Sequence, residues 1–500
     1  MTIPVIDLFA GPGGLGEGFA SYGGAARGSF RLSLSIEKDE NAHRTLLLRS
    51  FFRRLRQEYP QASDRLLRGE ATPEQLMRQY PRIAASASSE AVRLELSEGN
   101  ALEVRKLVDD AVSGEDLWVL IGGPPCQAYS LIGRARNRGI KGYVPEADTR
   151  QTLYVEYLQI LADHAQPVFV MENVKGLLSA RLYEQSIFER ILNDLTDPLA
   201  ALKREGRKRP RQRPRYSVLP LTQPPSLFPN SRDYLVRSED FGIPQARHRV
   251  ILVGIREDSH RRAPMVLQQQ PLRTVKGAIN DLPRLRSGMS EIEDSGSRWI
   301  QALRRASGAE WFYEVDTDVR RTIRDVLRRL REPDACRGSE VMSSAVGTAR
   351  SIRVEHALFN HSSRAHITAD LERYLFASAF AQVRGYSPPL TAFPKGLLPA
   401  HRNAAEPDSK TPFADRFRVQ VAGRVASTVT SHIAKDGHYY IHFDPSQCRS
   451  LTVREAARLQ TFPDNYIFCG PRTSQYQQVG NAVPPDLARQ IAGVVAGILS

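Results

Sequence analysis

The sequence has few cysteines and no long apolar run. Its four cysteines, Cys126, Cys336, Cys448 and Cys469, are far apart and form no Cys-x-x-Cys pair. This spacing argues against a zinc site and a disulfide framework, and it leaves room for one reactive cysteine. No run of about 18 apolar residues is present, and the N-terminus has no basic segment ahead of an apolar one. We therefore expect a cytoplasmic protein with no membrane partner and no bound metal.

Length and charge set the next limits. The chain has 500 residues, more than the roughly 250–300 at which a single core stops growing, so two domains are expected. Hydrophobic residues make up 41%, which is enough for a globular core. The formal net charge of +14 favours an anionic partner, either nucleic acid or an acidic membrane surface, and the lack of an apolar run favours the former.

Apolar runs that end in glycine or polar residues indicate the strands of one sheet. Segments of helix length separate them, which predicts parallel βαβ units, and their unbroken apolar character predicts a sheet covered on both faces. The fold class expected from this pattern is α/β. We expect strands at residues 4–9, 31–37, 92–97, 117–121, 168–171 and 250–255.

Two segments interrupt this pattern, and a third replaces it. Residues 43–91 are arginine-rich and mostly helical by pattern, whereas residues 201–215 hold eight basic residues and two prolines. The second segment is either a solvated loop, which we favour, or electrostatic support for nucleic-acid binding. From about 285 to 445 the alternation is lost, and the segment mixes short helices, prolines and basic residues. We therefore expect a first domain over 1–284, a smaller domain over 285–445, and a return to the first over 446–500.

A glycine-rich turn, DLFAGPGG at residues 7–14, follows the first expected strand. Glycines there let the backbone approach a ligand, and Glu37 at the end of the second strand is placed to accept hydrogen bonds from ribose hydroxyls. A dehydrogenase would use a similar turn, but the GxGxxG order is missing and Pro12 removes an N–H group from a phosphate cradle. The turn fits S-adenosylmethionine better, and a plain tight turn is the alternative.

Cys126 follows a buried strand in the segment GGPPCQAYS at residues 122–130. Ligands of open α/β sheets bind at the carboxyl ends of strands, and two prolines hold the backbone before Cys126 stiffly. Cys126 is therefore a candidate nucleophile, with a buried structural thiol as the alternative. The basic segment 132–148 that follows is either a loop that closes on phosphates or a surface loop without function.

Glu172 ends the next strand, at the same edge as Cys126. A carboxylate there can hydrogen-bond to and protonate a heterocyclic nitrogen, whereas a capping or ion-paired acid is the alternative. Arg247 and Arg249 alternate at the late strand and so point to the same face. Two arginines on one face can hold the carboxylate, a carbonyl oxygen and a phosphate, whereas His248 faces away and is expected to be structural.

Six segments resemble the motifs of the C5-cytosine DNA methyltransferase family and lie in the family's order. They are DLFAGPGGLGEGF at 7–19, GGPPCQAYS at 122–130, MENV at 171–174, FGIPQARHR at 241–249, SLTVREAARLQTFPD at 450–464 and QVGNAVPP at 478–485. The resemblance implies a Rossmann-like, S-adenosylmethionine-dependent methyltransferase sheet with a second, smaller target-recognition domain. It also implies the bacterial or phage type, a monomer that methylates double-stranded DNA and is paired functionally with a restriction endonuclease.

The resemblance also implies residue roles. Cys126 would add to C6 of a flipped cytosine, Glu172 would bind its N3, and Arg249 its O2. Arg247 would support the carboxylate or a phosphate. Asn100 stands where the family usually has an aspartate that accepts from the adenine amino group, and an amide oxygen can also accept that bond. The residues expected to bind the cofactor are Phe9, Gly11, Gly14, Glu37, Asn100, Pro125, Asn481 and Val483.

Two other functions stay open from the sequence. An RNA cytosine methyltransferase would use the same chemistry, but such members have a small recognition region and a Cys-Phe-Thr after the ENV segment. Here KGLLSARL follows at 175–182, and the region between 249 and 450 is large. A catalytically inactive DNA-binding homologue is the second alternative, and the intact Cys126, Glu172 and Arg249 count against it.

Overall fold

The computed structural model describes residues 2–23, 29–125, 153–182, 185–207, 213–224, 226, 229–259, 266–330, 336–342, 357–399 and 415–500. Cys126 and the basic segment 132–148 lie outside the described residues.

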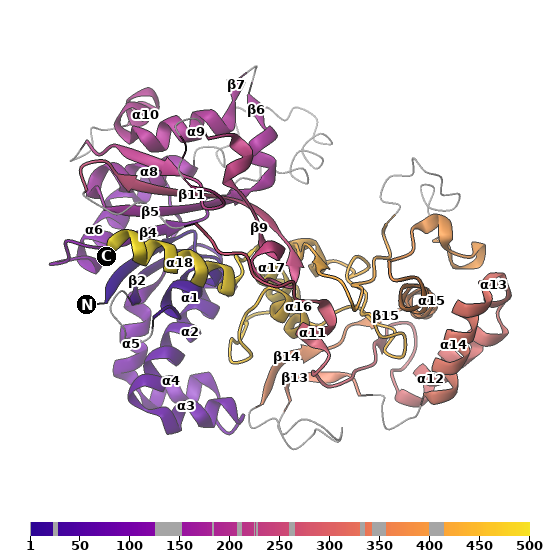
Figure 1. The fold of residues 1–500 in the computed structure, drawn as a ribbon. Coiled ribbons are helices and arrows are strands. Elements are labelled where there is room, and N and C mark those ends of the chain that lie inside the picture. The colour runs from indigo at the N-terminus through magenta and orange to yellow at the C-terminus, as the bar shows by residue number, and fades with distance from the viewer. Residues whose placement is uncertain are drawn as a thin grey trace.

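A mixed sheet of eight strands forms the centre of the larger lobe (Figure 1). Its order is β3-β2-β1-β4-β5-β11-β8, and β9 pairs with β11 beside this path. The strands from β3 to β5 are parallel, whereas β11 runs antiparallel to β5, β8 and β9. The expected Rossmann-like α/β sheet is thus confirmed. The strands are β1 (Ile3–Leu8), β2 (Phe30–Glu37), β3 (Ala91–Arg93), β4 (Val119–Gly122), β5 (Val168–Val174), β8 (Tyr216–Leu219), β9 (Leu235–Arg237) and β11 (His248–Arg256).

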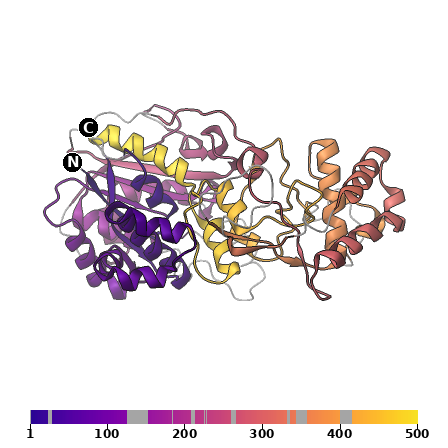
Figure 2. The same cartoon turned by 90° about the horizontal axis from the view of Figure 1, so that it is seen from below.

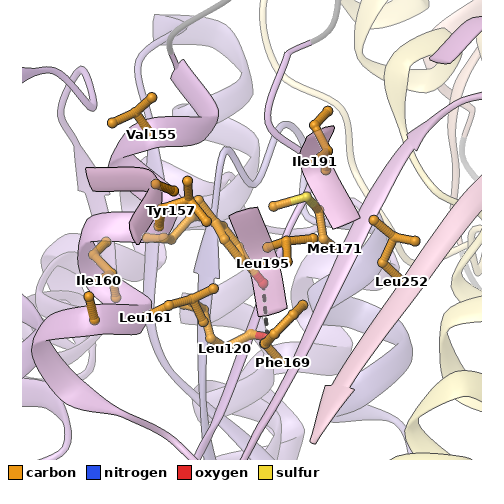
Figure 3. Packing of buried hydrophobic residues seen from close by; sticks show 14 of the residues in the cluster. Leu120, Val155, Tyr157, Ile160, Leu161, Phe169, Met171, Ile191, Leu195 and Leu252 are labelled. Carbon is orange, nitrogen blue, oxygen red and sulfur yellow. Dashed lines mark hydrogen bonds between the residues drawn. The ribbon is translucent and has the colours of Figure 1, made fainter. Parts of the chain in front are cut away.

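Helices cover both faces of this sheet, as the unbroken apolar strands predict. On one face, Leu120 and Phe169 pack against Tyr157 and Leu161 of α8 (Figure 3). The opposite face packs against the first and last helices of the chain, and Figure 2 shows the last helix lying along the sheet. The covering helices are α1 (Gly14–Ala20), α6 (Ala101–Ala111), α8 (Leu153–His164), α9 (Ile187–Thr196), α10 (Pro198–Arg204) and α18 (Pro485–Leu499).

Two strands end three or more residues away from their predicted carboxyl ends. The strand expected at 92–97 ends at Arg93. The last hydrogen bond to the neighbouring strand runs from Leu94 N to Glu37 O (3.2 Å), after which the chain leaves the sheet and Leu96 is buried in the core. The strand expected at 168–171 continues to Val174, because its ladder with β11 extends to the pair Val174 and Arg249. This extension places Glu172 within the strand rather than after it.

The 43–91 segment is helical, as predicted. Its helices pack around a core that includes Phe51, Leu66 and Ile83. The same core takes in Ala357 and Phe359, which lie at the start of a strand of the smaller lobe. The segment therefore contacts both lobes. Its helices are α2 (Glu40–Glu58), α3 (Pro60–Leu67), α4 (Pro73–Gln79) and α5 (Pro81–Glu90).

The smaller lobe has its own apolar core, to which four of its helices contribute residues. Figure 1 shows these helices away from the central sheet. The two longest, Thr317–Arg329 and Thr368–Arg384, have 13 and 17 residues and are longer than the short helices expected. In the first of them, arginines stand between the apolar residues Val319, Ile323 and Leu327 and obscure their helical spacing in the sequence. The helices are α12 (Gly296–Arg305), α13 (Glu310–Glu314), α14 (Thr317–Arg329) and α15 (Thr368–Arg384). Short strands accompany them: β12 (Gly288–Met289), β13 (Gly338–Met342), β14 (Leu358–Ser362) and β15 (Ala365–His366).

The remaining elements join the lobes or extend the sheet domain. The helices are α11 (Val275–Ile279), α16 (Val453–Leu459) and α17 (Arg472–Asn481), and the strands are β6 (Arg181–Leu182), β7 (Gln185–Ser186), β10 (Gln245–Ala246) and β16 (Ala426–Ser427). Within the described part of the chain, no helix combines the length and apolar character needed to cross a bilayer.

Candidate active site

The glycine-rich turn connects β1 to α1 at the carboxyl edge of the sheet. Phe9 and Gly11 both have a positive φ, of 56° and 57°. Gly11 N donates to Glu37 Oε2 (2.8 Å), and Asp39 N donates to Glu37 Oε1 (2.7 Å). The carboxylate of Glu37 is therefore fixed beside the turn, and each of its oxygens keeps lone-pair capacity for a further hydrogen bond from a ligand hydroxyl.

Gly14 brings the two ends of the chain together at this turn. A Cβ at Gly14 would lie 2.2 Å from Val483 O, so only glycine permits this approach. Asn481, two residues before Val483, ends α17 and is exposed. Residues 9–14, Glu37 and the segment 481–483 thus gather at one place, although more than 400 residues separate them in the sequence.

Asn100 makes its side-chain hydrogen bond outside this group. It ends a short 3-10 helix over Glu98–Asn100 at the start of α6, and its Nδ2 donates to Glu95 O (2.8 Å). Among the described residues, no hydrogen bond joins Asn100 to the turn or to Glu37. The hydrogen bond to Glu95 uses Nδ2, whereas Oδ1 is the atom that would accept from an adenine amino group. The role of Asn100 in cofactor binding therefore stays a prediction.

The loop toward Cys126 and the carboxylate of Glu172 are in contact. Strand pairing aligns Leu8 with Gly122 and Gly122 with Met171, so the ends of β1, β4 and β5 form one row. A Cβ at Gly123 would lie 3.1 Å from Glu172 Oε2. Pro125, which is partly buried, ends the described part of this loop. The site therefore has the Gly-rich turn, this loop and Glu172 as neighbours.

Glu172 forms an ion pair with Arg249. Arg249 Nε lies 2.7 Å from Glu172 Oε1, and Arg249 Nη1 donates to His248 O (2.9 Å). The side chains remain 14% and 13% exposed, for Arg249 and Glu172 respectively, so a ligand can reach them. A guanidinium has five N–H donors, and the contacts described here use only Nε and Nη1. Further N–H groups are available for a carbonyl oxygen.

Arg247 is buried, with 1% of its surface exposed. This burial argues against the phosphate role that the sequence suggests, whereas support of the Glu172 carboxylate stays a prediction. Arg247 Nη1 donates to Val429 O (2.8 Å) and to Gly480 O (3.1 Å). Burial holds the pKa of Arg247 well below its usual range, with repulsion from Arg249 as a smaller cause. In this structure Arg247 therefore ties three chain segments together and does not face a phosphate.

His248 makes a contact of the structural kind that the sequence suggests. Its Nε2 lies 2.8 Å from Glu239 Oε1, away from the pair of Glu172 and Arg249. Among the described residues, no cluster of histidine, cysteine, aspartate and glutamate is arranged to hold a metal ion.

Comparison with known proteins identifies this arrangement. The sequence profile of the C-5 cytosine-specific DNA methylase family matches residues 95–198 and 233–496. The chain belongs to this family. The methylase is 30% identical over 519 residues to the type II methyltransferase M.Bpa9945I of Bacillus paralicheniformis, with 99% of each chain covered. It is 26% identical over 452 residues to the DNA (cytosine-5-)-methyltransferase M.ApeKI of Aeropyrum pernix, covering 80% of this chain and 85% of that one.

A solved structure agrees with the fold of the methylase. It is described as a DNA modification methyltransferase encoded within an E. coli prophage and has a TM-score of 0.51 at 17% identity, with 100% of this chain and 99% of that chain covered. The methylase is thus an enzyme of the DNA (cytosine-5-)-methyltransferase class, of the restriction–modification type.

Residues of the methylase that the sequence did not single out connect its motifs. Gln245 Oε1 accepts from Val429 N (2.6 Å), and Gln245 Nε2 donates to Gln460 Oε1 (2.9 Å). Gln460 Nε2 in turn donates to Val479 O (2.7 Å). A Cβ at Gly480 would lie 2.3 Å from the backbone of Thr430 and Ser431. The sequence shows a glutamine inside each of two motifs, Gln245 and Gln460, and this could have marked them. It does not show which residues these side chains contact.

Asp7 is a second residue that the sequence did not single out. Burial raises the pKa of its carboxyl to about 8, with Glu37 adding a smaller rise, against a hydrogen bond from the backbone of Gly16 that lowers it. Among the described residues, Asp7 Oδ2 has no hydrogen-bond partner. A buried carboxyl with a raised pKa thus begins the glycine-rich segment 7–14.

Proposed function

We propose that this methylase transfers a methyl group from S-adenosylmethionine to C5 of a flipped cytosine in duplex DNA, through a covalent adduct between Cys126 and C6. The observation that supports the proposal most is the Glu172–Arg249 ion pair beside Gly123, three residues before Cys126. The reacting atoms of cytosine are inaccessible in a duplex, so the base must leave the stack. We further propose that the enzyme acts as a monomer in the cytoplasm.

The proposed mechanism begins at Cys126. Its thiolate forms a bond to C6, which breaks the aromaticity of the ring and makes C5 an enamine carbon. Glu172, protonated at this step, delivers a proton to N3 and so neutralises the charge that develops there, while Arg249 holds O2 and keeps Glu172 in place. S-adenosylmethionine, when bound, would supply the electrophilic methyl group to C5 and leave as S-adenosylhomocysteine. Loss of the C5 proton to a base then expels the Cys126 thiolate, and N3 returns its proton to Glu172, which restores the ring.

The residues at the glycine-rich turn fit the proposed cofactor. Glu37 presents carboxylate oxygens to ribose hydroxyls, and the open space around a Cβ at Gly11 leaves room for a ligand close to the backbone. Phe9 and the exposed Asn481 lie at the same edge. With Pro12 in the turn, one N–H group of a pyrophosphate cradle is missing, which favours a ligand without a pyrophosphate.

We propose that residues 285–445 recognise the DNA sequence. The chemistry at the sheet edge is the same for every cytosine, so discrimination requires contacts to base edges from another part of the chain. The separate core under α12–α15 allows this segment to vary without disturbing the sheet. The methylation would protect DNA from a companion restriction endonuclease.

A trapping experiment tests the proposed reaction. Duplex DNA with 5-fluorocytosine at the target should become covalently attached to the enzyme. The fluorine replaces the C5 proton whose removal releases Cys126, so the adduct cannot break down. Cys126→Ser should bind the same DNA without attachment, since a serine hydroxyl is far less ionised at neutral pH than a thiol. Attachment that survives in Cys126→Ser would refute the assignment. RNA of the same sequence in a parallel reaction decides between DNA and RNA as substrate.

A further inference from the structure

Tyr466 connects the return segment after α16 to the glycine-rich turn. Its side chain is 1% exposed, and its ring packs against Phe462 and Phe468 with centroids 4.8 and 5.4 Å away. Its hydroxyl donates a hydrogen bond to the carbonyl of Pro12, in the middle of the turn. Burial raises the pKa of Tyr466, so the hydroxyl stays protonated and remains a donor.

The turn has little freedom once this bond is made. Gly13 N donates to Ala10 O (2.9 Å), and Gly11 is held by Glu37, so Tyr466 supplies an attachment between these two. Gly13 has a φ of 89°, and a Cβ there would lie 2.6 Å from Leu46 Cδ2 and 3.0 Å from the Tyr466 hydroxyl. The tyrosine and Leu46 of α2 thus pack against the turn at Gly13.

Arg49 of α2 holds the tyrosine and α1 together. Its Nε donates to Glu17 Oε2 (2.9 Å), and Glu17 lies on α1 directly after the turn. The guanidinium lies 4.9 Å from the centre of the Tyr466 ring, and Nη1 donates to Asn465 Oδ1 (3.1 Å). The first helix of the 43–91 region therefore contributes to the same attachment.

We propose that Tyr466 is a positioning residue for the cofactor, whose hydroxyl holds the glycine-rich turn in its binding conformation while Arg49 fixes the tyrosine against α1. The identity of the cofactor, S-adenosylmethionine, rests on the proposed function. If the turn is already ordered, binding of the ligand does not carry the entropic cost of ordering it, and the affinity is higher. Removing the hydroxyl should therefore weaken cofactor binding without touching the reacting atoms.

The test compares Tyr466→Phe with Tyr476→Phe. Tyr476 is a matched control, because it is fully buried and its hydroxyl also donates to a backbone carbonyl, that of Leu451 (2.6 Å), away from the turn. Titration calorimetry with S-adenosylhomocysteine should show a Kd raised about threefold to tenfold in Tyr466→Phe, the loss expected for one neutral hydrogen bond. Tyr476→Phe should bind as the wild type does. In steady-state assays, only KM for S-adenosylmethionine should rise in Tyr466→Phe, with kcat and KM for DNA unchanged.

The outcomes separate this inference from the proposed function. If the wild type binds neither S-adenosylmethionine nor S-adenosylhomocysteine, the proposed function is wrong. If the wild type binds and Tyr466→Phe binds equally well, the positioning role is wrong. An equal loss of affinity in Tyr466→Phe and Tyr476→Phe would also overturn the inference, because it would reflect a general loosening of the fold.

Discussion

Arg249 Nε lies 2.7 Å from Glu172 Oε1, and the two residues come from neighbouring antiparallel strands. The pairing of β11 with β5 sets this geometry, since Arg249 lies opposite Val174 and Ile251 opposite Glu172. The arginine therefore reaches diagonally across the ladder to the carboxylate. Each member fixes the rotamer of the other, which positions both before a substrate arrives.

Glu172→Gln should slow methylation by about 10²–10⁴-fold while DNA binding is retained, because an amide cannot deliver a proton to N3. Single-turnover methylation and a binding titration on the same DNA measure the two effects. Glu115→Gln is the control, since Glu115 also pairs with an arginine, Arg31, but precedes β4 and so lies away from the carboxyl edge. A Glu172→Gln enzyme with the wild-type rate would show that the carboxylate is structural.

Arg247→Ala should lower the free energy of unfolding by about 3 kcal/mol or more, because it opens a cavity and leaves the carbonyls of Val429 and Gly480 unpaired. Urea unfolding measures this loss. The salt dependence of DNA binding by the folded variant should match the wild type, since the side chain does not face solvent. Unchanged stability together with a shallower salt dependence would restore the phosphate role that the sequence suggests.

Three arginines of the basic run already have carboxylate partners. Arg204 pairs with Asp194 (2.6 Å), Arg207 with Glu156 (2.6 Å) and Arg215 with Asp197 (3.0 Å). Replacing all three arginines by glutamine should leave unchanged the slope of log K for DNA binding against log salt concentration. If these side chains neutralise phosphates in the wild type, the slope would instead become shallower by about 0.9 for each phosphate. Fluorescence anisotropy at several salt concentrations measures the slope. A shallower slope would favour the DNA-binding interpretation over the solvated loop.

Asp7→Asn should change how stability depends on pH. The carboxyl has a pKa of about 8 in the folded protein and an ordinary value of 3.8, so between these values the folded state binds a proton that the unfolded chain releases. Its contribution to the free energy of unfolding therefore falls as pH rises, by about 1.4 kcal/mol per pH unit. Asp7→Asn removes this slope. In urea unfolding from pH 5 to 8, the free energy of unfolding of the variant should therefore rise relative to that of the wild type as the pH increases. Parallel curves would mean that Asp7 is ionised.

Exchanging residues 285–445 with the matching segment of a relative should transfer the target sequence and leave the reaction at Cys126 intact. The reason is that base-edge contacts, worth about 1–3 kcal/mol each, choose the site, whereas the sheet edge treats every cytosine alike. Bisulfite sequencing of DNA from expressing cells reads the result. An active chimera that keeps the parental target would contradict the recognition role.

The sequence was most informative where a strand ends. Glu37 and Glu172 were identified from their places near the carboxyl ends of apolar runs, and the structure places both at that edge. Arg247 shows the limit. Alternation indicated which way its side chain points, but not that Val429 and Gly480, 182 and 233 residues further along, cover that side. Long-range packing of this kind leaves no periodic signal, and the same holds for Tyr466 and Pro12.

The packing of α18 against α1 also has a consequence for synthesis. One face of the sheet, with Ile3 and Val5 of β1, stays partly uncovered until α18 packs on it beside α1. At about 5–20 residues per second, roughly 25–100 s separate the emergence of β1 from the ribosome from that of α18. During this interval the nascent chain carries an uncovered apolar surface while residues 285–445 are translated. Chaperones that bind nascent chains should therefore raise the yield of active enzyme. The increase should be larger than for a protein whose first strands are covered by the helices that follow them directly in the sequence.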